Sequence, residues 1–457
     1  MATHPNILLI ISDDHRHSAL HGFGEPAVQT PVLDRLAADG VAMRRAHIMG
    51  GMTGAVCIPA RACLHTGAHV FRCSVGHSVE AGRALSTLNP ELALLGETLR
   101  GAGYQTFATG KWHNDRASFA RSFEGAARIF FGGMCDHDKV PLHDFDPTGA
   151  YPPEQAYIGE GFSSELFADA AVDFLTNHAD GRPFFLYLAF TAPHDPRTPP
   201  PEYAALYDPA AIPLPPNFLP EHPFDNGELR VRDEQLAPWP RTPEVIRQHM
   251  ADYYGMISHM DAQIGRVLDA LDQAGHADNT LVVYLADHGL AVGQHGLMGK
   301  QNLYDHSIRV PLILRGPGVP AGRQVNELVY SYDLFPTLCD LVGLPIPPTV
   351  DSRSFAGLVQ GRETSGRETV FAVYKDVQRM VSDGRWKLIR YYRAHERGVG
   401  EDRLQLFHLA EDLWETQDLA GQSAYRHELE RLAQALADWM QAVGDPLAAV
   451  PILPNSP

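Results

Sequence analysis

Cysteine is scarce in this sequence, and the regular spacing found in disulfide-rich domains is missing. Five cysteines occur among 457 residues, an odd number without paired spacing. Small secreted domains held together by disulfides carry even, regularly spaced sets of cysteines. The sequence therefore argues against a disulfide framework and fits a reducing compartment.

Long hydrophobic runs and a basic leader are also missing. The chain leads within a few residues into Asn6-Ile-Leu-Leu-Ile-Ile-Ser12, a run too short to span a membrane. No basic segment with a small-residue cleavage site precedes this run. We therefore expect a cytoplasmic protein with no membrane partner.

Basic residues are few relative to acidic residues. The chain has 37 lysines and arginines against 55 acidic residues, for a formal net charge of -18. Such a field repels nucleic acid, so nucleic acid is not expected as a partner, and an anionic substrate needs a local cluster of cations. The length and the 44% hydrophobic content suffice for a large core and a second, smaller one.

Short apolar runs alternate with helical patterns over most of the chain. This alternation predicts a large, doubly wound, mostly parallel sheet within an α/β fold. The predicted parallel strands are 7–11, 105–108, 184–190, 280–285 and 310–314, and the predicted helices are 31–39, 91–100, 163–178 and 242–274. Segments 132–153 and 195–241 interrupt the pattern, and loops of that length are usually functional.

The pattern changes at about residue 370. Short alternating strands such as 379–382 and 386–392 precede an amphipathic helix at 425–442. We expect a catalytic domain over residues 1–369 and a smaller C-terminal α+β domain over 370–457, with an antiparallel sheet.

Polar residues follow the ends of four predicted strands. They are Asp13-Asp14, Gly110-Lys111-Trp112-His113, Ala192-Pro193-His194 and Asp287-His288-Gly289. In open α/β sheets, ligands bind beyond the carboxyl ends of the strands, so these residues are expected at one rim.

Three of these residues are carboxylates that repel one another. A cation between Asp13, Asp14 and Asp287 would relieve that repulsion. Oxygen-rich ligation favours Ca²⁺ or Mg²⁺ over zinc, and one imidazole from His288 does not change this preference. Taken singly, each acidic pair can equally be a solvated loop.

The segment Cys57-Ile-Pro-Ala-Arg61 carries a candidate nucleophile. Pro59 suits the first turn of a helix, which places Cys57 at the positive N-terminal end. An unmodified thiolate there can itself act as a nucleophile.

Cys-x-Pro-Ala-Arg followed by Leu-x-Thr-Gly resembles the signature of the type I sulfatases, in the alkaline phosphatase superfamily. The strand-end motifs named above, Lys300 ahead of 309–312, and Leu406-Phe-His-Leu409 extend the resemblance over most of the chain. It implies that a formylglycine-generating enzyme oxidises Cys57 to formylglycine, whose hydrate attacks the sulfur of a sulfate ester. It also implies a divalent cation, with Ca²⁺ favoured over Mn²⁺ or Mg²⁺.

One position departs from the arylsulfatase pattern. Many members carry asparagine where this chain has His288, whereas the iduronate-2-sulfatase and choline-sulfatase branches are similar to it in this Asp-His-Gly. The resemblance therefore implies a small sulfated substrate, a sugar or alkyl sulfate, in place of a simple aryl sulfate.

The resemblance also implies a role for each residue. The metal ligands are Asp13, Asp14, residue 57, Asp287 and His288. Arg61 and Lys111 steady the hydrate, His194 and Lys300 bind sulfate and help protonate the departing alcohol, and His113 removes a proton to release sulfate. Seen alone, Lys300 reads as a surface lysine and His194 as a loop histidine.

Two other functions stay open. A phosphonate monoester or phosphodiester hydrolase of the same superfamily would use almost the same residues. A catalytically silent binding protein would keep the fold without converting Cys57. The sequence leaves self-association into a homo-oligomer open as well.

Overall fold

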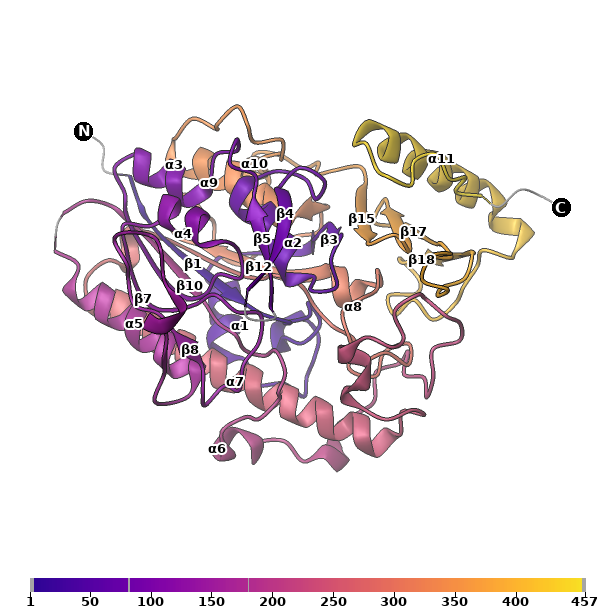
Figure 1. Cartoon of the computed structure of the whole chain (residues 1–457), viewed down its shortest axis with the longest axis horizontal. Helices are drawn as coiled ribbons and strands as arrows, with labels where there is room; N and C mark the ends of the chain where they lie inside the picture. Colours follow the sequence, from indigo (N-terminus) through magenta and orange to yellow (C-terminus); the bar gives the residue numbers. More distant parts are fainter. Residues whose placement is uncertain (1–3, 81–82, 180, 454–457) are drawn as a thin grey trace.

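Two β-sheets organise the chain (Figure 1). The computed structural model describes residues 4–80, 83–179 and 181–453. The larger sheet has the strand order β13-β2-β12-β11-β1-β10-β6-β7, with β14 beside β2. Its strands are β1 (Asn6–Ser12), β2 (Val41–His47), β6 (Gln105–Lys111), β7 (Gly125–Phe130), β10 (Phe184–Ala189), β11 (Thr280–Ala286), β12 (Arg309–Arg315), β13 (Arg323–Val325) and β14 (Val329–Tyr330).

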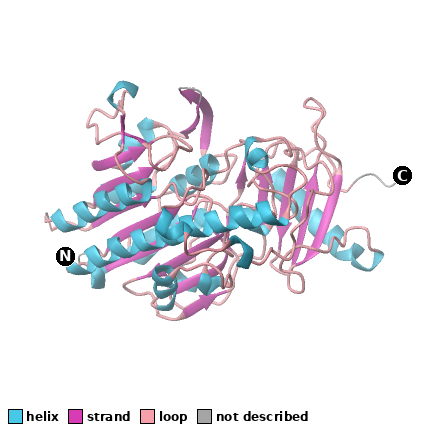
Figure 2. Ribbon diagram, turned by 90° about the horizontal axis from the view of Figure 1, so that it is seen from below, coloured by secondary structure: helices cyan, strands magenta, loops and turns pink. Residues whose placement is uncertain are grey.

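Helices cover both faces of this sheet (Figures 1 and 2). One face packs against α1 (Pro31–Ala38), α5 (Ser163–Asn177) and α7 (Pro243–Gln273), and the other against α2 (Cys57–Thr66), α3 (Leu95–Gly101), α4 (Arg116–Ser122) and α9 (Leu334–Val342). Alternate residues of β1 enter the two cores, and every residue from Ile7 to Ile11 is fully buried. The predicted doubly wound α/β architecture is therefore confirmed.

The parallel arrangement predicted for residues 310–314 is wrong. β12 runs antiparallel to both β11 and β2, whereas β1, β6, β7, β10 and β11 are parallel. Between β11 and β12 the chain forms a loop and the short helix α8 (Asp305–Ile308). A connection without a long crossover helix returns the strand in the opposite direction.

The helix predicted from residue 91 begins later. Before α3, the side chain of Asn89 accepts a hydrogen bond from the backbone nitrogen of Glu91 and holds a turn. The Glu97 carboxylate accepts from the nitrogen of Leu94, which fixes the helix start at Leu95. The helices predicted at 31, 163 and 242 begin within one residue of the expected positions.

The second sheet has the order β18-β17-β16-β15-β3 and carries α11 (Arg426–Ala442) on one face. Its antiparallel strands are β15 (Val370–Tyr374), β16 (Gln378–Ser382), β17 (Trp386–Tyr391) and β18 (Arg403–His408). The segment before α2 supplies β3 (Gly50–Gly51), which pairs parallel with β15. The small sheet therefore anchors the chain just ahead of Cys57.

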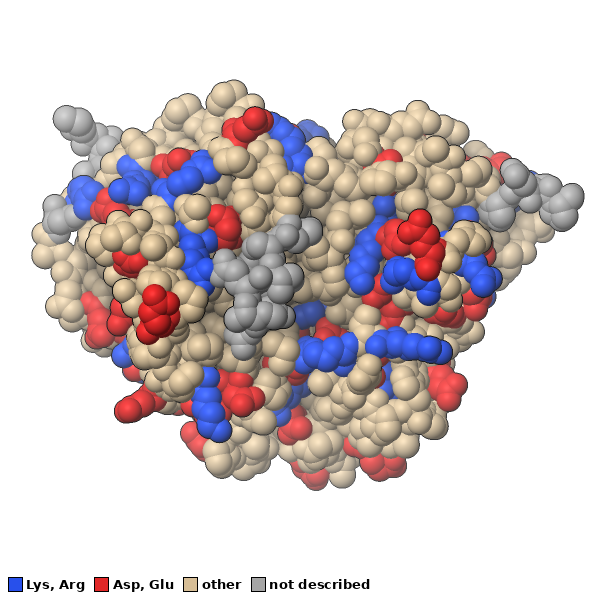
Figure 3. Space-filling model, in the orientation of Figure 1, with Lys and Arg blue, Asp and Glu red and all other residues tan. Residues whose placement is uncertain are grey.

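The remaining elements are short. They are β4 (Ser74–Glu80), β5 (Arg83–Leu88), β8 (Pro141–Leu142), β9 (Tyr157–Ile158), α6 (Pro201–Ala204) and α10 (Ala356–Val359). Acidic and basic side chains are interspersed over the face in Figure 3. In the part of the chain that the structure describes, none of the helices has the length and apolarity that a bilayer-spanning segment requires.

A buried ion cluster joins the two sheets. The Nζ atom of Lys387, on β17, lies 2.8 Å from a carboxylate oxygen of Asp305 and 2.6 Å from one of Glu415. Replacing Lys387 by methionine leaves both acids without this cation. We expect the free energy of unfolding, measured by urea denaturation, to fall by about 3–5 kcal/mol.

The matched control is Arg426→Met, which removes an exposed ion pair with Glu430 on α11. Exposed pairs contribute little, so a change below about 1 kcal/mol is expected. Equal stability losses in the two variants would contradict the importance of the buried cluster.

Candidate active site

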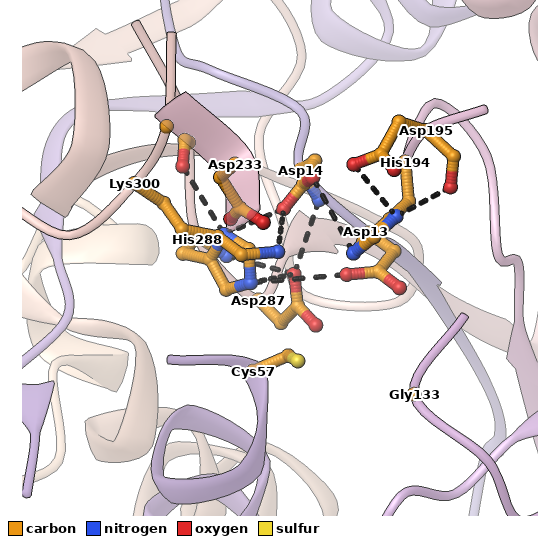
Figure 4. Close-up of polar contacts among 12 residues, drawn as sticks. Asp13, Asp14, Cys57, Gly133, His194, Asp195, Asp233, Asp287, His288 and Lys300 are labelled. Atoms are coloured by element: carbon orange, nitrogen blue, oxygen red, sulfur yellow. Dashed lines mark hydrogen bonds and ion pairs between the residues drawn. The ribbon is translucent and has the colours of Figure 1, made fainter. Parts of the chain in front are cut away.

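The carboxyl ends of four neighbouring strands bring the predicted polar residues together (Figure 4). The strands lie side by side in the order β11, β1, β10 and β6. Near their carboxyl ends, residues 286, 12, 189 and 110 are aligned across the sheet to within one residue. Asp13 and Asp14 follow β1, His194 follows β10, and Asp287 and His288 follow β11. Lys111 is the last residue of β6.

The three carboxylates are buried around the His288 ring. The Nδ1 atom of His288 lies 3.0 Å from Asp14, and its Nε2 atom lies 3.5 Å from Asp287 and 3.8 Å from Asp13. Asp14 has a φ of 69°, a left-handed conformation that non-glycine residues rarely adopt. Its backbone nitrogen thereby donates to Asp287 at 3.3 Å, so the backbone turn directs these acids toward one point.

Each carboxylate also faces its own cation. Lys111 contacts Asp13, Lys300 lies 2.8 Å from Asp14, and Arg61 lies 2.8 Å from Asp287. Burial and the neighbouring Asp287 oppose ionisation of Asp13, but Lys111, His194 and Arg61 outweigh both and lower its pKa. The Asp13 carboxylate is therefore charged at neutral pH, which a metal ligand requires.

The donors fit a divalent cation. The Oδ1 atom of Asp13 and the Nε2 atom of His288 are buried without a hydrogen-bond partner. Ligand atoms of Asp13, Cys57 and His288 lie within 4.8 Å of one another, and a second such group joins Asp13 and Asp14 to His194. The carboxylates of Asp13, Asp14 and Asp287 outnumber the imidazoles of His288 and His194, and a mostly oxygen set of donors matches the preference of a hard cation.

Cys57 faces this cluster from the start of α2 (Figure 4). Its side chain is buried, and Sγ lies 3.2 Å from Nδ1 of His113. Burial opposes ionisation of the thiol, yet Lys111, His113 and Lys300 hold its pKa well below the usual value. The helix N-terminus favours negative charge in the same direction, so the position suits an anionic nucleophile.

Arg61 lies one turn further along α2 and is fully buried. Besides Asp287, its guanidinium donates to the carbonyl oxygen of Lys111 at 2.8 Å and to the Tyr187 hydroxyl at 3.1 Å. It therefore ties α2 to β6, β10 and β11. The role expected for it at residue 57 stays a prediction, as do the other assigned roles.

Lys300 and His194 are buried parts of the site. Lys300 is only 4% exposed, which rules out the surface lysine that the sequence alone suggested. The Nε2 atom of His194 lies 3.7 Å from Asp14, and its Nδ1 atom contacts the carbonyl oxygen of Asp195 at 2.7 Å.

A cavity of about 350 Å³ opens above Cys57. Its lining includes residues that sequence reasoning missed, in particular Arg232, Asp233 and Gln301. Arg232 donates to Asp195 at 2.5 and 3.0 Å and to Asp233 at 2.7 Å. The full lining is Gly54, Ala55, Cys57, His113, Gly133, Met134, His194, Val231, Arg232, Asp233, Lys300 and Gln301.

Gly133 leaves room for His113. A Cβ atom at residue 133 would lie 2.7 Å from both Cε1 and Nε2 of the His113 ring, so the ring would have to move. Because an error of about 1 Å in a catalytic group can cost about 10²-fold, we expect Gly133→Ala to lower kcat by about 10- to 100-fold without unfolding the protein. Steady-state kinetics and a thermal melt measure the two effects.

The matched control is Gly101→Ala, at the end of α3, where an added Cβ meets nothing within 4 Å. This variant should retain the kcat of the parent. A Gly133→Ala variant as active as the control would contradict the placement of His113 in the reaction.

Comparison with known proteins identifies relatives over nearly the whole chain. The Sulfatase family model matches residues 5–344, and the model of the N-sulphoglucosamine sulphohydrolase C-terminal region matches residues 293–442. An N-acetylglucosamine-6-O-sulfatase of Bacteroides thetaiotaomicron is 25% identical over 96% of this chain and 87% of that protein. Iduronate 2-sulfatase of Mus musculus is 28% identical over 77% of this chain and 71% of that protein.

Solved structures share the fold at lower identity. A protein in complex with its substrate D-glucosamine-2-N,6-O-disulfate matches with a TM-score of 0.79 and 21% identity, over 97% of this chain and 99% of that one. The phosphonate monoester hydrolase of Agrobacterium radiobacter matches with a TM-score of 0.74 and 24% identity, over 96% of each chain. Likeness at this level establishes the architecture alone.

Proposed function

Because this chain belongs to the sulfatase family, we propose that it hydrolyses a sugar or small alkyl sulfate to the alcohol and inorganic sulfate through formylglycine formed from Cys57. It is a sulfuric ester hydrolase. The observation that carries the proposal is the position of Cys57. Its Sγ atom lies within 4.8 Å of ligand atoms of Asp13 and His288, at the start of a helix.

The residues that would hold the metal are Asp13, Asp14, Asp287, His288 and residue 57. A bound divalent cation would withdraw charge from the sulfate oxygens and favour the anionic form of the formylglycine hydrate. We propose Ca²⁺, because three carboxylates and one imidazole form a hard, oxygen-rich set, and Mn²⁺ and Mg²⁺ are the alternatives to test.

Formylglycine formed from Cys57 would supply, as its hydrate, the nucleophile for the sulfur of the ester. Sγ of Cys57 here stands in for a hydrate oxygen, so the Nζ atoms of Lys111 and Lys300 stabilise negative charge at that position. The sulfur would form a bond to this oxygen as its bond to the ester oxygen breaks. His194, together with Lys300, protonates the departing alcohol.

The second step releases sulfate and restores the aldehyde. His113, whose Nδ1 atom is 3.2 Å from Sγ, accepts the proton of the remaining hydroxyl. Loss of this proton would allow the carbon–oxygen bond to sulfate to break and the aldehyde to re-form, and a water molecule would then restore the hydrate. One ester and one water therefore give one alcohol and one sulfate.

Mass spectrometry of the peptide that contains residue 57 tests the nucleophile. Protein from the native host, or protein produced together with a formylglycine-generating enzyme, should carry an aldehyde at residue 57. A peptide from the native host with only the thiol would favour the silent binding protein.

Rates on paired substrates test the reaction class. We expect kcat/KM on a glucosamine 6-sulfate or choline sulfate to exceed that on a phosphonate monoester with the same alcohol. The relatives named as sugar sulfatases favour the first substrate. Faster hydrolysis of the phosphonate would replace the proposal by the phosphonate hydrolase alternative.

We also propose that the enzyme is cytoplasmic and meets its substrate as an imported small molecule or fragment. Cys57, Cys63, Cys73 and Cys339 are free thiols, which is compatible with a reducing compartment. Fractionation of the native host followed by immunodetection tests this location.

A further inference from the structure

A second cavity of about 500 Å³ lies apart from the active site. Its walls come from the segment after β1, the proline-rich loop at 213–216 and residues 413–415. None of its lining residues lines the active-site cavity. The proposed sulfatase reaction therefore gives this space no role.

Two arginines form one wall. Nε of Arg309 donates to the carbonyl oxygen of Arg44 at 2.8 Å, and the Arg44 guanidinium lies 4.1 Å from the centre of the Phe23 ring. Arg44 itself donates to the carbonyl oxygen of Phe23 at 3.0 Å. Among the residues the structure describes, no carboxylate lies within ion-pair distance of Arg44.

Three acids line this cavity: Glu25 accepts a hydrogen bond from the backbone nitrogen of Ala27 at 3.3 Å, and Asp305 and Glu415 are paired with Lys387. Lys387, behind the wall, lies 2.8 Å from Asp305 and 2.6 Å from Glu415. Arg309 reaches Asp305 only at 3.7 Å. Burial, and then repulsion by the charge of Arg309, lower the pKa of Arg44. The positive charge of these two guanidinium groups is therefore not fully balanced by carboxylates.

His17 adds an unsatisfied polar atom at this wall. Its side chain is buried, its ring packs 4.9 Å from that of Phe23, and its Nε2 atom has no hydrogen-bond partner. Burial, then Arg309 and Arg44, hold the pKa of His17 well below its usual value, so the ring is neutral. A buried polar atom left without a partner is costly, and an oxygen of a ligand can supply that partner.

Another part of the lining is apolar. It contains Pro213, Leu214, Pro215 and Pro216, with Trp414 beside them. A volume of about 500 Å³ is larger than an inorganic oxyanion needs and falls in the range of small-molecule sites. The cavity thus combines a cationic wall with a rigid hydrophobic one.

We propose that this cavity binds a small organic anion, with its oxyanion group held by Arg44, Arg309 and His17 and its apolar body packed on the proline-rich wall. Carboxylate, sulfonate and phosphate groups share the required chemistry. The site is distinct from the one that holds the sulfate ester.

Crystallography with 4-bromobenzenesulfonate tests the location. The bromine gives an anomalous signal, and the sulfonate group is not an ester that the enzyme can hydrolyse. We expect a bromine peak near residues 213–216 with the sulfonate beside Arg44 and Arg309. A peak confined to the active-site cavity, or no peak, would overturn the proposal.

Calorimetric titration with the same compound tests the recognition. The Arg44→Met variant should bind about tenfold or more weakly at this site, because it loses a charged donor. The control is Arg45→Met, the next residue of β2, which does not line this cavity. Affinity that is unchanged in Arg44→Met, or equally reduced in both variants, would contradict the proposal, and thermal melts verify that both variants are folded.

Discussion

The Cys57→Ala variant is expected to hydrolyse sulfate esters at least about 10³-fold more slowly than the parent, because loss of a covalent nucleophile removes the reaction path that depends on it. In the structure, Nδ1 of His113 lies 3.2 Å from Sγ of Cys57, and the nearby positive charges of Lys111 and Lys300, which contact Asp13 and Asp14, help to hold the pKa of Cys57 well below its usual value. Without that side chain, these groups have no developing negative charge to stabilise. The measurement is kcat/KM on a glucosamine 6-sulfate with protein that has been checked for aldehyde at residue 57.

Cys63→Ala provides the matched control. Cys63 lies on the same helix and is equally buried, but it does not line the cavity. Its replacement costs some packing and should leave kcat/KM within a few-fold of the parent. If Cys57→Ala retained activity comparable with that control, residue 57 would not be the nucleophile.

The central sheet could be predicted because its strands are buried on both faces. Runs such as 7–11 and 280–285 have no charged residues and are mostly aliphatic, which is the pattern of a strand covered by two layers of helices. The direction of β12 could not be predicted, because an apolar run gives the same pattern in a parallel and in an antiparallel strand. Only the connection before the strand determines its direction. The two glycines of β3 have no pattern at all, and they join the small sheet only through distant pairing with β15.

The inner part of the site could be predicted from the strand ends. Asp13, Lys111, His194 and Asp287 follow or end neighbouring strands, so the order of the sheet brings them together. The outer part could not be predicted. Arg232 and Asp233 lie in a proline-rich segment without periodicity, and only the fold brings Arg232 to Asp195 and both residues to the cavity.

The hydrogen-bond partners of Arg61 could not be predicted from the resemblance alone, and its role at residue 57 stays a prediction. Arg61 was expected to steady the hydrate at residue 57, and in the structure its hydrogen bonds go to Asp287, Tyr187 and a backbone carbonyl. A sequence motif identifies which residue types are present but not which acid each arginine contacts. The packing of α2 against the residues that follow β11 determines which acid Arg61 contacts.

The second large effect is expected for Asp13→Asn, which should lose the bound divalent cation and lower kcat/KM by about 10³-fold or more. One oxygen of Asp13 is buried without a hydrogen-bond partner and lies among the other candidate ligands. Asparagine keeps the shape but removes the charge that offsets dehydration of the cation. Metal content measured by elemental analysis, together with kcat/KM, checks both parts.

Asp261→Asn is the control because Asp261 is also a buried acid, but it lies on α7 and accepts hydrogen bonds from the nitrogens of Val32 and Leu33 at the start of α1. Asparagine keeps one of the two accepting oxygens, so this variant loses one hydrogen bond and some stability but should keep its metal and its activity. Adding Ca²⁺, Mn²⁺ or Mg²⁺ to metal-stripped parent protein then identifies the cation that restores the rate. Full metal content in Asp13→Asn would mean that the cation binds elsewhere, and the carboxylates at the strand ends would then be balanced by Lys111, Lys300 and Arg61 alone.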